Sequence, residues 1–571
     1  MRQRLLLILS VVAVAACAPR PARPEDPRSV LLITIDTLRA DRLGVYGDTR
    51  ARTPAIDALA RSGVVFERAY TPVPITLPAH VSLMTGLIPP AHGVRGNGAF
   101  ALGRGPGTLA ESMKAGGRAT AAFIGGFPLA RRFGLDRGFD LYDETMSKAP
   151  GANYDFAERR AVDVVAAAGK WLGETHGSVF LWVHLFDPHA PYDPPPEFRT
   201  GDPYRDEVAA VDVSIRELLR VWDARPGKTV VALAADHGEA FGEHGEWSHS
   251  LFVYDTTLRV PLMIRAEGFT PGVRAKVTVS LVDVAATLVE TAGGSGRPLP
   301  GVSLRGATRP GASDRALYAE TLSPRLDFGW SELRSWREGG FKWIRAPQPE
   351  LYALTDDPTE SANRAASDTA RAGSLEADLS RALAKAGEAS SGRSPDSEGA
   401  ERLRSLGYVQ SPGGGGSGAD PKTKVELARK IAGATGPFAS WEDAVRAYEP
   451  LVSADAGNPL LNMRLGDALL RAGRPEASLV HFRRVVNRGP LTADAHVGYA
   501  TALAQLGRTG EARKVLEAAV VVDSANGQAH YNLGEIARLD GRIGDARREY
   551  EMAGHDPVTA ARALSRLAEL R

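Results

Sequence analysis

Four clusters of polar side chains combine the residue types from which metal sites and nucleophilic sites are built. They are Asp36-Thr37, residues 76–97 with Thr76 and Asn97, "HLFDPHAPY" with Asp187 and His189, and "ADHGEAFGEHGEWSH" with Asp236, His237, His244 and His249. Aspartate and histidine side chains packed together are costly to bury unless a metal ion or hydrogen bonds compensate their desolvation. Taken singly, each cluster is explained equally well by a capped turn. Taken together, they predict a metal site.

The predicted ligands are two carboxylates, one imidazole and one hydroxyl. Asp36, Asp236 and His237 supply the first three, and Thr76 supplies the oxygen of its side chain. A hydroxyl bound to a divalent cation loses its proton more easily, which is how a weak nucleophile is activated. The set therefore predicts one divalent cation with Thr76 held beside it.

The stretch "PITLPAHVSLMTG" predicts a short helix, with Pro78 at its first position and Gly86 just past its end. Thr76 then lies where backbone amides and the positive end of the helix dipole converge, a place that stabilises an anion. The alternative is that Thr76 only caps the helix. The other clusters favour a nucleophile over a cap.

Apolar runs that alternate with amphipathic ones must position these clusters. The continuous runs are typical of buried parallel strands, and the amphipathic stretches between them of helices that cover both faces of a sheet. The polar residues after Ile35, Phe186 and Ala235 then meet at the carboxyl edge of the sheet, where such folds bind ligands. The runs in question are "SVLLITID", "TPAIDALARSGVVF", "GSVFLWVHLFDPH" and "GKTVVALAADHGE".

Residues 29–384 are therefore predicted to form an α/β domain with a mostly parallel sheet sandwiched by helices. Within it, residues 315–355 have short alternating runs separated by Gly and Pro, which predict a small antiparallel subdomain. Residues 385–424 are rich in Gly, Ser and Pro and predict a flexible linker, with a short helix at "ERLRSLGYV".

Residues 425–571 repeat. A Gly-Arg pair recurs at Gly473, Gly507 and Gly541, each 34 residues apart with a helical pattern on either side, and "WEDAVRAYEPLVSA" looks like half of an earlier unit. This period resembles that of tetratricopeptide repeats, all-α solenoids that commonly bind a peptide or another protein. A plain helical bundle is the alternative. A flexible linker would only tether the repeats, so that a chain ending near Gly413 keeps its metal and its turnover on a small ester but loses a protein partner in the envelope. The alternative is that the repeats dock on the enzyme domain and stabilise it.

The N-terminus predicts export. Arg2 and Arg4 precede an apolar run too short to span a bilayer, and small residues lead to Cys17, the only cysteine of the chain. Residues 1–17 therefore resemble a lipoprotein signal peptide with Cys17 as the lipidated residue, and residues 18–28 look like a tether. This places the protein in a bacterial cell envelope, lipid-anchored on the periplasmic or outer side. The formal net charge of +1 implies no nucleic-acid partner.

The order of the motifs closely resembles that of the sulfatases of the alkaline phosphatase superfamily. The resemblance covers residues 30–354. It implies that Asp36, Asp236 and His237 bind the metal and that Thr76 is the nucleophile. The motifs that carry it are "DTLRADRLGVYG", "HAPYDPP", "DHGEAFGEHG" and "RVPLMIR".

The same resemblance assigns three further residues. His189 and His249 match residues that contact the transferred group or its leaving oxygen, and Asn97 matches an amide that binds the non-bridging oxygens in phosphate-transferring relatives. Asp187 is expected only to orient its loop.

The departures from the family pattern bear on the chemistry. Thr76 and His80 stand where sulfatases have a cysteine or serine that becomes formylglycine and an arginine, and threonine cannot undergo that conversion. Thr37 replaces a second aspartate, and a less anionic site favours Zn²⁺ or Mn²⁺ over Ca²⁺, which stays possible. Threonine nucleophiles are similar to those of the phosphodiesterase, phosphoethanolamine transferase and lipoteichoic acid synthase branches.

Three functions follow as hypotheses. The first is a lipid-anchored hydrolase of phosphoric, phosphonic or sulfuric esters on a small molecule, glycan or lipid. The second is an envelope transferase that passes the group to a glycan or lipid. The third is an inactive scaffold that acts through its repeats, and the intact Asp36, Thr76, Asp236 and His237 argue against it.

Overall fold

The computed structural model describes residues 28–98, 100–146, 158–293, 298–389, 418–434, 438–487 and 493–570. The predicted signal peptide with Cys17, nearly all of the tether, and the helix expected at "ERLRSLGYV" lie outside the described residues. Within the described ranges, no helix combines the length and the apolar character that crossing a membrane requires.

The N-terminal domain is built on a nine-stranded sheet in the order β4-β3-β5-β1-β6-β8-β2-β7, with β9 also paired to β2. β1 lies between β5 and β6 and is parallel to both, whereas β8 runs antiparallel to β6 and to β2. The prediction of a mostly parallel sheet is confirmed. The strands are β1 (Ser29–Ile35), β2 (Val64–Tyr70), β3 (Ala119–Ile124), β4 (Leu141–Asp143), β5 (Val179–Leu185), β6 (Thr229–Ala235), β7 (Arg259–Val260), β8 (Leu262–Arg265) and β9 (Arg274–Ser280).

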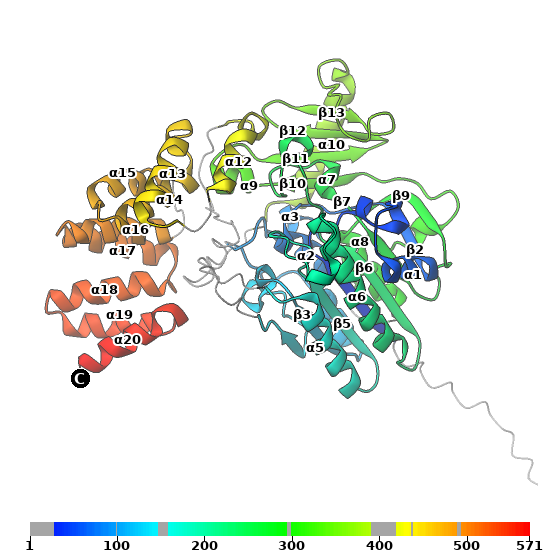
Figure 1. The fold of residues 1–571 in the computed structure, drawn as a ribbon, viewed down its shortest axis with the longest axis horizontal. Coiled ribbons are helices and arrows are strands. Elements are labelled where there is room, and N and C mark those ends of the chain that lie inside the picture. The colour runs from blue at the N-terminus through cyan, green and yellow to red at the C-terminus, as the bar shows by residue number, and fades with distance from the viewer. Residues whose placement is uncertain are drawn as a thin grey trace, which may run out of the picture.

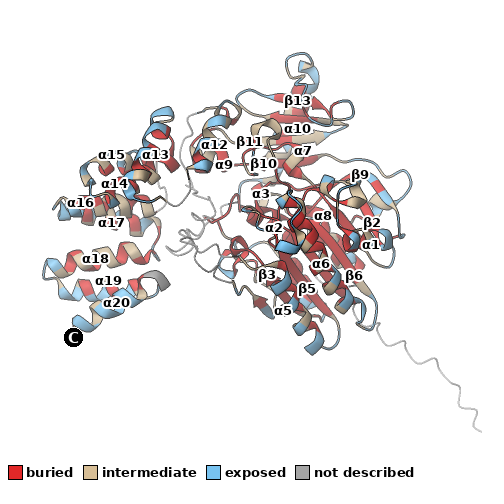
Figure 2. Cartoon of the chain, in the orientation of Figure 1, coloured by how far each residue is buried: buried red, intermediate tan, exposed pale blue. Residues whose placement is uncertain are grey.

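Helices cover both faces of this sheet, as the continuous apolar strands require. One packed group consists of α1, α5 and α6, and a second consists of α2, α4 and α8. Every residue of β1 and β5 is buried, and Figure 2 shows these strands as a buried layer between half-exposed helices. The helices are α1 (Pro54–Ser62), α2 (Thr76–Thr85), α4 (Leu109–Ala115), α5 (Ala161–Glu174), α6 (Pro203–Asp223) and α8 (Val282–Thr291).

The central strands deliver the polar clusters to one edge. The ladder continues one residue past each strand: Asp36 N donates to Leu185 O at 2.9 Å, and Asp236 N donates to Ile35 O at 3.4 Å. Because parallel strands end at the same edge, these contacts place the residues that follow β1, β5 and β6 beside one another.

A second, antiparallel sheet has the order β10-β11-β12-β13, as the alternating pattern predicts. Helix α10 (Thr369–Ala386) packs on it, and α9 (Ser323–Phe328) follows its first strand. The strands are β10 (Leu317–Thr321), β11 (Leu333–Glu338), β12 (Phe341–Arg345) and β13 (Glu350–Ala353).

The C-terminal region is entirely helical, in pairs that Figure 1 shows stacked in an arc. Gly473, Gly507 and Gly541 lie between the two helices of successive pairs with φ of +75°, +75° and +72°, a left-handed conformation that glycine adopts without steric cost. The repeat prediction is confirmed. The helices are α12 (Val425–Gly433), α13 (Trp441–Ala454), α14 (Pro459–Arg471), α15 (Pro475–Val486), α16 (Ala493–Gln505), α17 (Thr509–Val522), α18 (Gly527–Leu539), α19 (Ile543–Ala553) and α20 (Pro557–Glu569).

The two halves of the chain are in contact. Trp330 Nε1 donates to Asp455 Oδ2 at 2.7 Å, and Ser331 N donates to Ala419 O at 2.9 Å. Of the predicted 385–424 linker, residues 385–386 complete α10, and residues 418–424 are described next to α12. The first helices after the linker therefore dock on the second sheet. The sequence favoured a flexible tether over this docked arrangement.

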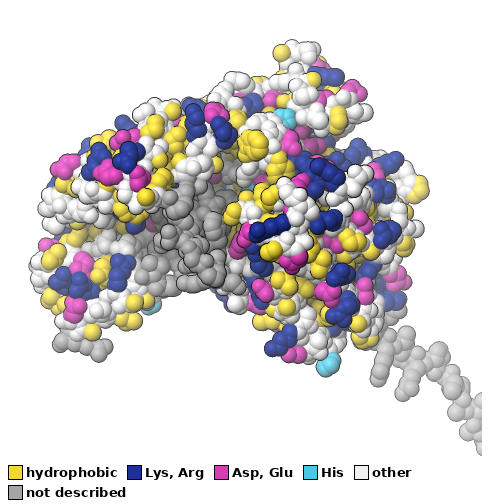
Figure 3. Space-filling model, in the orientation of Figure 1, with side chains coloured by type: hydrophobic (Ala, Val, Ile, Leu, Met, Phe, Trp, Pro, Cys, Tyr) yellow, Lys and Arg dark blue, Asp and Glu magenta, His cyan; other side chains and the backbone are white. Residues whose placement is uncertain are grey.

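Charged side chains are mixed over the surface. On the face drawn in Figure 3, Lys and Arg are interspersed with Asp and Glu over both halves of the chain. This distribution fits the near-zero net charge of the sequence.

Candidate active site

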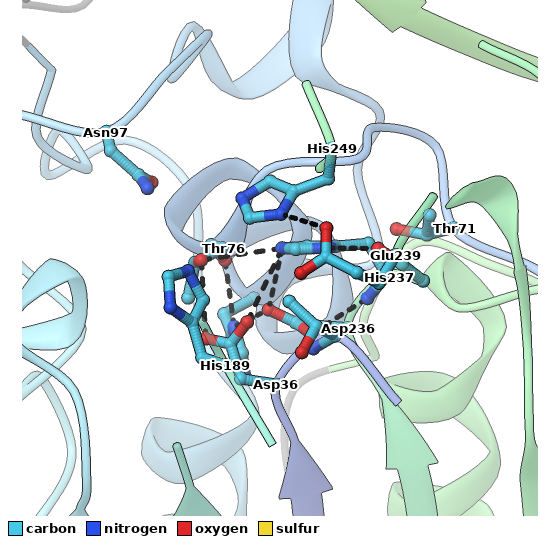
Figure 4. Close-up of polar contacts among 12 residues, drawn as sticks. Asp36, Thr71, Thr76, Asn97, His189, Asp236, His237, Glu239 and His249 are labelled. Carbon is cyan, nitrogen blue, oxygen red and sulfur yellow. Dashed lines mark hydrogen bonds and ion pairs between the residues drawn. The ribbon is translucent and has the colours of Figure 1, made fainter. Parts of the chain in front are cut away.

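The three predicted metal ligands converge at the carboxyl edge of the sheet, each 0% exposed (Figure 4). Asp36 follows β1, and Asp236 and His237 follow β6. His237 Nε2 lies 3.6 Å from Asp36 Oδ1 and 3.5 Å from Asp236 Oδ2, and one ligand atom of each residue falls within 4.8 Å of the others. These three side chains form a cluster that could hold a metal ion.

The hydrogen-bond partners of the carboxylate oxygens support a metal site. Asp236 Oδ1 accepts hydrogen bonds from His237 N and Thr37 N, at 2.8 and 3.3 Å. Asp36 Oδ1 and Asp236 Oδ2, by contrast, are buried and accept no hydrogen bond from any described residue. Burial raises the pKa of both carboxyls well above the ordinary value, and for Asp36 the neighbouring Asp236 and Glu239 raise it further. A divalent cation held by these side chains would remove both penalties.

Thr76 lies beside this cluster. Its Oγ1 is 3.4 Å from Asp36 Oδ2 and 3.5 Å from His237 Nε2, and the residue is 0% exposed. Helix α2 begins at Thr76 itself, preceded by Ile75 in an extended conformation. The hydroxyl is thus directed at the candidate ligands, and Thr76 does not occupy the capping position.

The start of α2 differs from the sequence prediction. Pro78 is the third helical residue and not the first, while Gly86 ends the helix with φ of +72° as expected. The first four amides of a helix have no intrahelical acceptor, so a proline is tolerated throughout the first turn. The early start brings the Thr76 amide and hydroxyl to the mouth of the helix.

A buried layer of hydrogen bonds supports the site from below. Thr34 Oγ1 accepts from Trp182 Nε1 at 2.9 Å and contacts His80 Nε2 at 3.0 Å and His184 Nδ1 at 3.2 Å. His80 Nδ1 donates to Thr76 O at 2.8 Å. Burial lowers the pKa of His80 to about 4 and that of His184 well below the ordinary value, so both rings are neutral.

His80, which stands in the arginine position of the family motif, is therefore a support for Thr76. The sequence analysis missed Thr34 and His184. Their signal is strand periodicity, because they are register partners in β1 and β5.

The two histidines predicted to contact the transferred group, His189 and His249, have different hydrogen-bond partners. His189 Nδ1 donates to Ala190 O at 2.6 Å, which leaves Nε2 as an acceptor; this buried atom has no hydrogen-bond partner among the described residues. Burial, and after it the nearby His249, lower the pKa of His189 to about 4. His249 Nδ1 instead lies 3.1 Å from Glu239 Oε1. A carboxylate at Nδ1 orients an imidazole as in catalytic triads, whereas His189 Nδ1 is bonded to a backbone carbonyl, so His249 is the better placed proton donor of the two.

Glu239 is a third residue of the site that the sequence analysis did not single out. It is 0% exposed, and its second oxygen accepts from Tyr192 OH at 3.0 Å. Its place two residues after His237 in "ADHGEAF" put it in the right cluster. Its hydrogen-bond partner His249 lies ten residues later in a loop, and the contact between the two forms only in the folded chain.

Asn97 also joins the site. Its Oδ1 accepts from Leu77 N at 2.8 Å, and Figure 4 places it beyond Thr76, on the side away from Asp236. Arg95, in the same loop, makes a buried two-pronged ion pair with Glu320 of β10, with both distances at 2.6 Å. The second sheet thereby holds the loop that carries Asn97.

Three residues of the original clusters have other roles. The Thr37 hydroxyl donates to Pro188 O at 3.0 Å and so is not directed at the candidate metal ligands, which agrees with the expectation that Thr37 does not act as a ligand in place of the second aspartate. Asp187 accepts from Ala161 N at 2.8 Å and Arg160 Nη1 at 3.0 Å, so it orients its loop at the start of α5. His244 stacks on Tyr254, with ring centroids 3.6 Å apart.

Comparisons with known proteins agree with the fold and with the motif order. Residues 28–294 match the sulfatase family model, and residues 439–490, 463–521 and 500–557 match a tetratricopeptide repeat model. Mouse steryl-sulfatase is 34% identical over 132 residues, 20% of this chain and 21% of that protein. An ulvan-active sulfatase of Formosa agariphila is 27% identical over 317 residues, 47% of this chain and 61% of that protein. The chain thus matches between about a fifth and three fifths of these relatives.

Solved structures share the architecture of the N-terminal part. The phosphonate monoester hydrolase of Agrobacterium radiobacter superposes with a TM-score of 0.52 at 22% identity, covering 63% of this chain and 96% of that one. A sulfatase from Bacteroides thetaiotaomicron gives 0.54 at 20% identity, covering 64% and 93%. At these identities the likeness concerns the fold alone.

Proposed function

We propose that the sulfatase-family domain of this chain, which tetratricopeptide repeats follow, hydrolyses phosphoric and phosphonic esters through a covalent intermediate on Thr76. The observation that carries the proposal is the position of the Thr76 hydroxyl, 3.4 Å from Asp36 Oδ2 and 3.5 Å from His237 Nε2 at the N-terminus of α2. A hydroxyl held there is in place to attack and has the Thr76 N–H and the positive end of the helix dipole beside it for the developing charge.

The residues that would hold a metal ion are Asp36, Asp236 and His237, with Thr76 as the fourth ligand. Two carboxylates, an imidazole and a hydroxyl suit Zn²⁺ or Mn²⁺ better than Ca²⁺, which prefers six to eight oxygens. When bound, such an ion would neutralise the carboxylates and acidify the Thr76 hydroxyl.

In the first step the Thr76 oxygen bonds to phosphorus and the bond from phosphorus to the leaving oxygen breaks. The Thr76 proton is directed at Asp36 Oδ2, and His249 Nε2 delivers a proton to the leaving oxygen. Asn97 and the Thr76 N–H are the groups that would bind the non-bridging oxygens, because Leu77 N already donates to Asn97 Oδ1 and Pro78 has no N–H. In the second step water attacks phosphorus and the bond from phosphorus to the Thr76 oxygen breaks. His249 Nε2 takes the proton of the water, and Asp36 Oδ2 returns a proton to the Thr76 oxygen.

The choice of phosphorus over sulfur follows from the nucleophile. Thr76 has no aldehyde hydrate, the group through which sulfatases release sulfate. We expect bis(p-nitrophenyl) phosphate and p-nitrophenyl phenylphosphonate to be hydrolysed with a higher kcat/KM than p-nitrophenyl sulfate. The three esters share one leaving group, so the comparison isolates the transferred group. A sulfate ester preferred over both phosphorus esters would contradict the proposal.

Glu239→Gln tests the assignment of His249 as the proton donor. Loss of the carboxylate should lower kcat for an ester with a poor leaving group, such as phenol, by about 100-fold, which is the lower end of what general acid catalysis contributes. Esters of p-nitrophenol, which need little protonation, should lose far less.

The matched control for that experiment is Tyr192→Phe, which removes the other hydrogen bond to Glu239 and keeps its charge. It should show a smaller loss on the phenyl ester, with parental metal content. Equal losses on both leaving groups in Glu239→Gln would mean that Glu239 only supports the fold.

A further inference from the structure

Hydrogen bonds to the catalytic domain hold both ends of the loop that carries His249. This His249 loop, residues 242–250, is closed internally by Gly242 N to Glu246 O and Ala240 N to Ser248 O, both at 2.7 Å. Arg39 Nη1 fixes its beginning through Glu243 Oε1 at 2.7 Å. Its end is held by the Thr321 hydroxyl, which donates to Ser250 O. The catalytic domain thus fastens both ends of the loop.

The middle of the loop rests on the start of the helical region. A Cβ placed on Gly245 would lie 2.6 Å from Val425 Cγ1, so the Val425 side chain packs directly on the Gly245 backbone. Gly245 also has φ of +81°, a conformation that other residues adopt only with strain. The contact therefore leaves no room for a side chain at position 245, and only glycine lets the loop backbone come this close to α12.

The segment that follows His249 is buried against the same helix. Leu251, Phe252, Val253 and Tyr254 belong to one apolar cluster, and the partly buried side chains packed on it include Ala419, Val425, Leu427 and Ala428. Phe252 and Val253 are 0% exposed. We call residues 419–428 the docking segment, because they join the helical region to this cluster.

A second contact anchors the docking segment. Phe328 stacks on Trp330, with ring centroids 4.5 Å apart, and packs both on the cluster after His249 and on the cluster formed by α12–α14. Trp330 is 0% exposed and donates to Asp455 at the end of α13. Figure 1 shows α12 between the second sheet and the arc of repeats. The helical region is thus attached by a buried apolar contact as well as by the chain.

We propose that the docking segment is a positioning element of the active site, which holds the His249 loop so that His249 can protonate the leaving group. The proposal rests on the proposed function, because it assigns His249 that task. Without the docking segment, only the two ends of the loop and its internal hydrogen bonds would hold it, and the loop could shift at Gly245. Misplacing a catalytic group by about 1 Å can cost 100-fold in rate. The helical repeats are then part of the catalytic unit.

Val425→Asp in the full chain tests this, with Arg429→Asp as the matched control. Both variants place a new carboxylate on α12, but Arg429 is exposed and lies outside the cluster after His249. Val425→Asp should lower kcat for a phenyl ester about 10- to 100-fold, with a smaller loss on the p-nitrophenyl ester and unchanged metal content. Arg429→Asp should behave like the parent.

Hydrogen exchange of residues 242–254 gives a readout that needs no activity. Val425→Asp should raise exchange there, and Val425→Ala should do so to a smaller extent without burying a charge. Faster exchange with parental turnover of the phenyl ester would overturn the positioning role, and unchanged exchange in both variants would overturn the docking itself. A parent protein that hydrolyses no ester would refute the proposed function, while the exchange data would still decide whether the docking segment holds the loop.

Discussion

Thr76→Ala should abolish turnover of every phosphorus ester, with kcat falling by about 10⁴- to 10⁶-fold, as when a covalent nucleophile is removed from other hydrolases. The hydroxyl is the only group of Thr76 that faces Asp36 and His237, and no other described hydroxyl contacts this cluster as closely. Because Ile75 and not Thr76 precedes the helix, the substitution removes no cap. Initial rates on the phosphonate ester measure the loss, and the circular dichroism and melting temperature should stay near those of the parent.

Thr76→Ser is the matched control, because it keeps the hydroxyl and removes one methyl group. It should retain a readily measurable fraction of parental turnover. Rapid quenching of the parent with the phosphonate ester should also trap an adduct on the peptide that contains Thr76, and the alanine variant should give none. Alanine at this position with more than about one hundredth of parental kcat would place the nucleophile elsewhere.

Protein purified without chelator should carry about one divalent transition metal per chain, and Asp236→Ala should lose it. The variant removes one of the two buried carboxylates whose oxygens lack hydrogen-bond partners, and with it a ligand that no described neighbour replaces. Metal affinity should fall by more than the 10- to 100-fold that is typical of a lost supporting residue. Elemental analysis measures metal per chain, and Zn²⁺ or Mn²⁺ should dominate.

Asp187→Ala is the control for this loss. Asp187 also follows a central strand, but its carboxylate is bonded to the start of α5 and to Arg160, so this variant should keep its metal. If Asp236→Ala, correctly folded, bound as much metal as the parent, the ligand cluster would be misplaced.

Chelation of the parent should lower its melting temperature at neutral pH. Burial raises the pKa of the Asp36 and Asp236 carboxyls in the folded chain above the unfolded value, so their ionisation destabilises the metal-free protein. That penalty should diminish as the pH falls toward the range in which they are protonated.

Local patterns in the sequence predicted the strands, the repeats and the first contact layer of the site. Apolar runs ending in Asp36 and Asp236 defined both the strands and the edge at which they end, because parallel strands share that edge. The 34-residue spacing of glycines defined the repeats for a similar reason, since each unit repeats one local structure.

The residues that support the ligands and His249 are brought together by contacts between distant segments of the chain. Local sequence patterns carry little information about such contacts. Thr34 and His184 meet only because β1 and β5 pair in one register, and Glu239 acquires its role only when the His249 loop folds back. The expectation of a flexible tether came from the composition of residues 385–424. This Gly-rich composition describes the chain between two domains, whereas Phe328, Trp330 and Val425 decide whether those domains touch.

The contact between Val425 and Gly245 has a thermodynamic consequence for whatever binds the repeats. If the docked arrangement and the catalytic position of His249 are the same state, a ligand of the repeats that prefers α12 docked must strengthen binding of a transition-state analogue, and the analogue must strengthen binding of that ligand by the same factor. A ligand that prefers α12 released must weaken both. The apolar contacts between α12 and residues 245–254 would thus couple occupancy of a protein-binding surface to the position of His249.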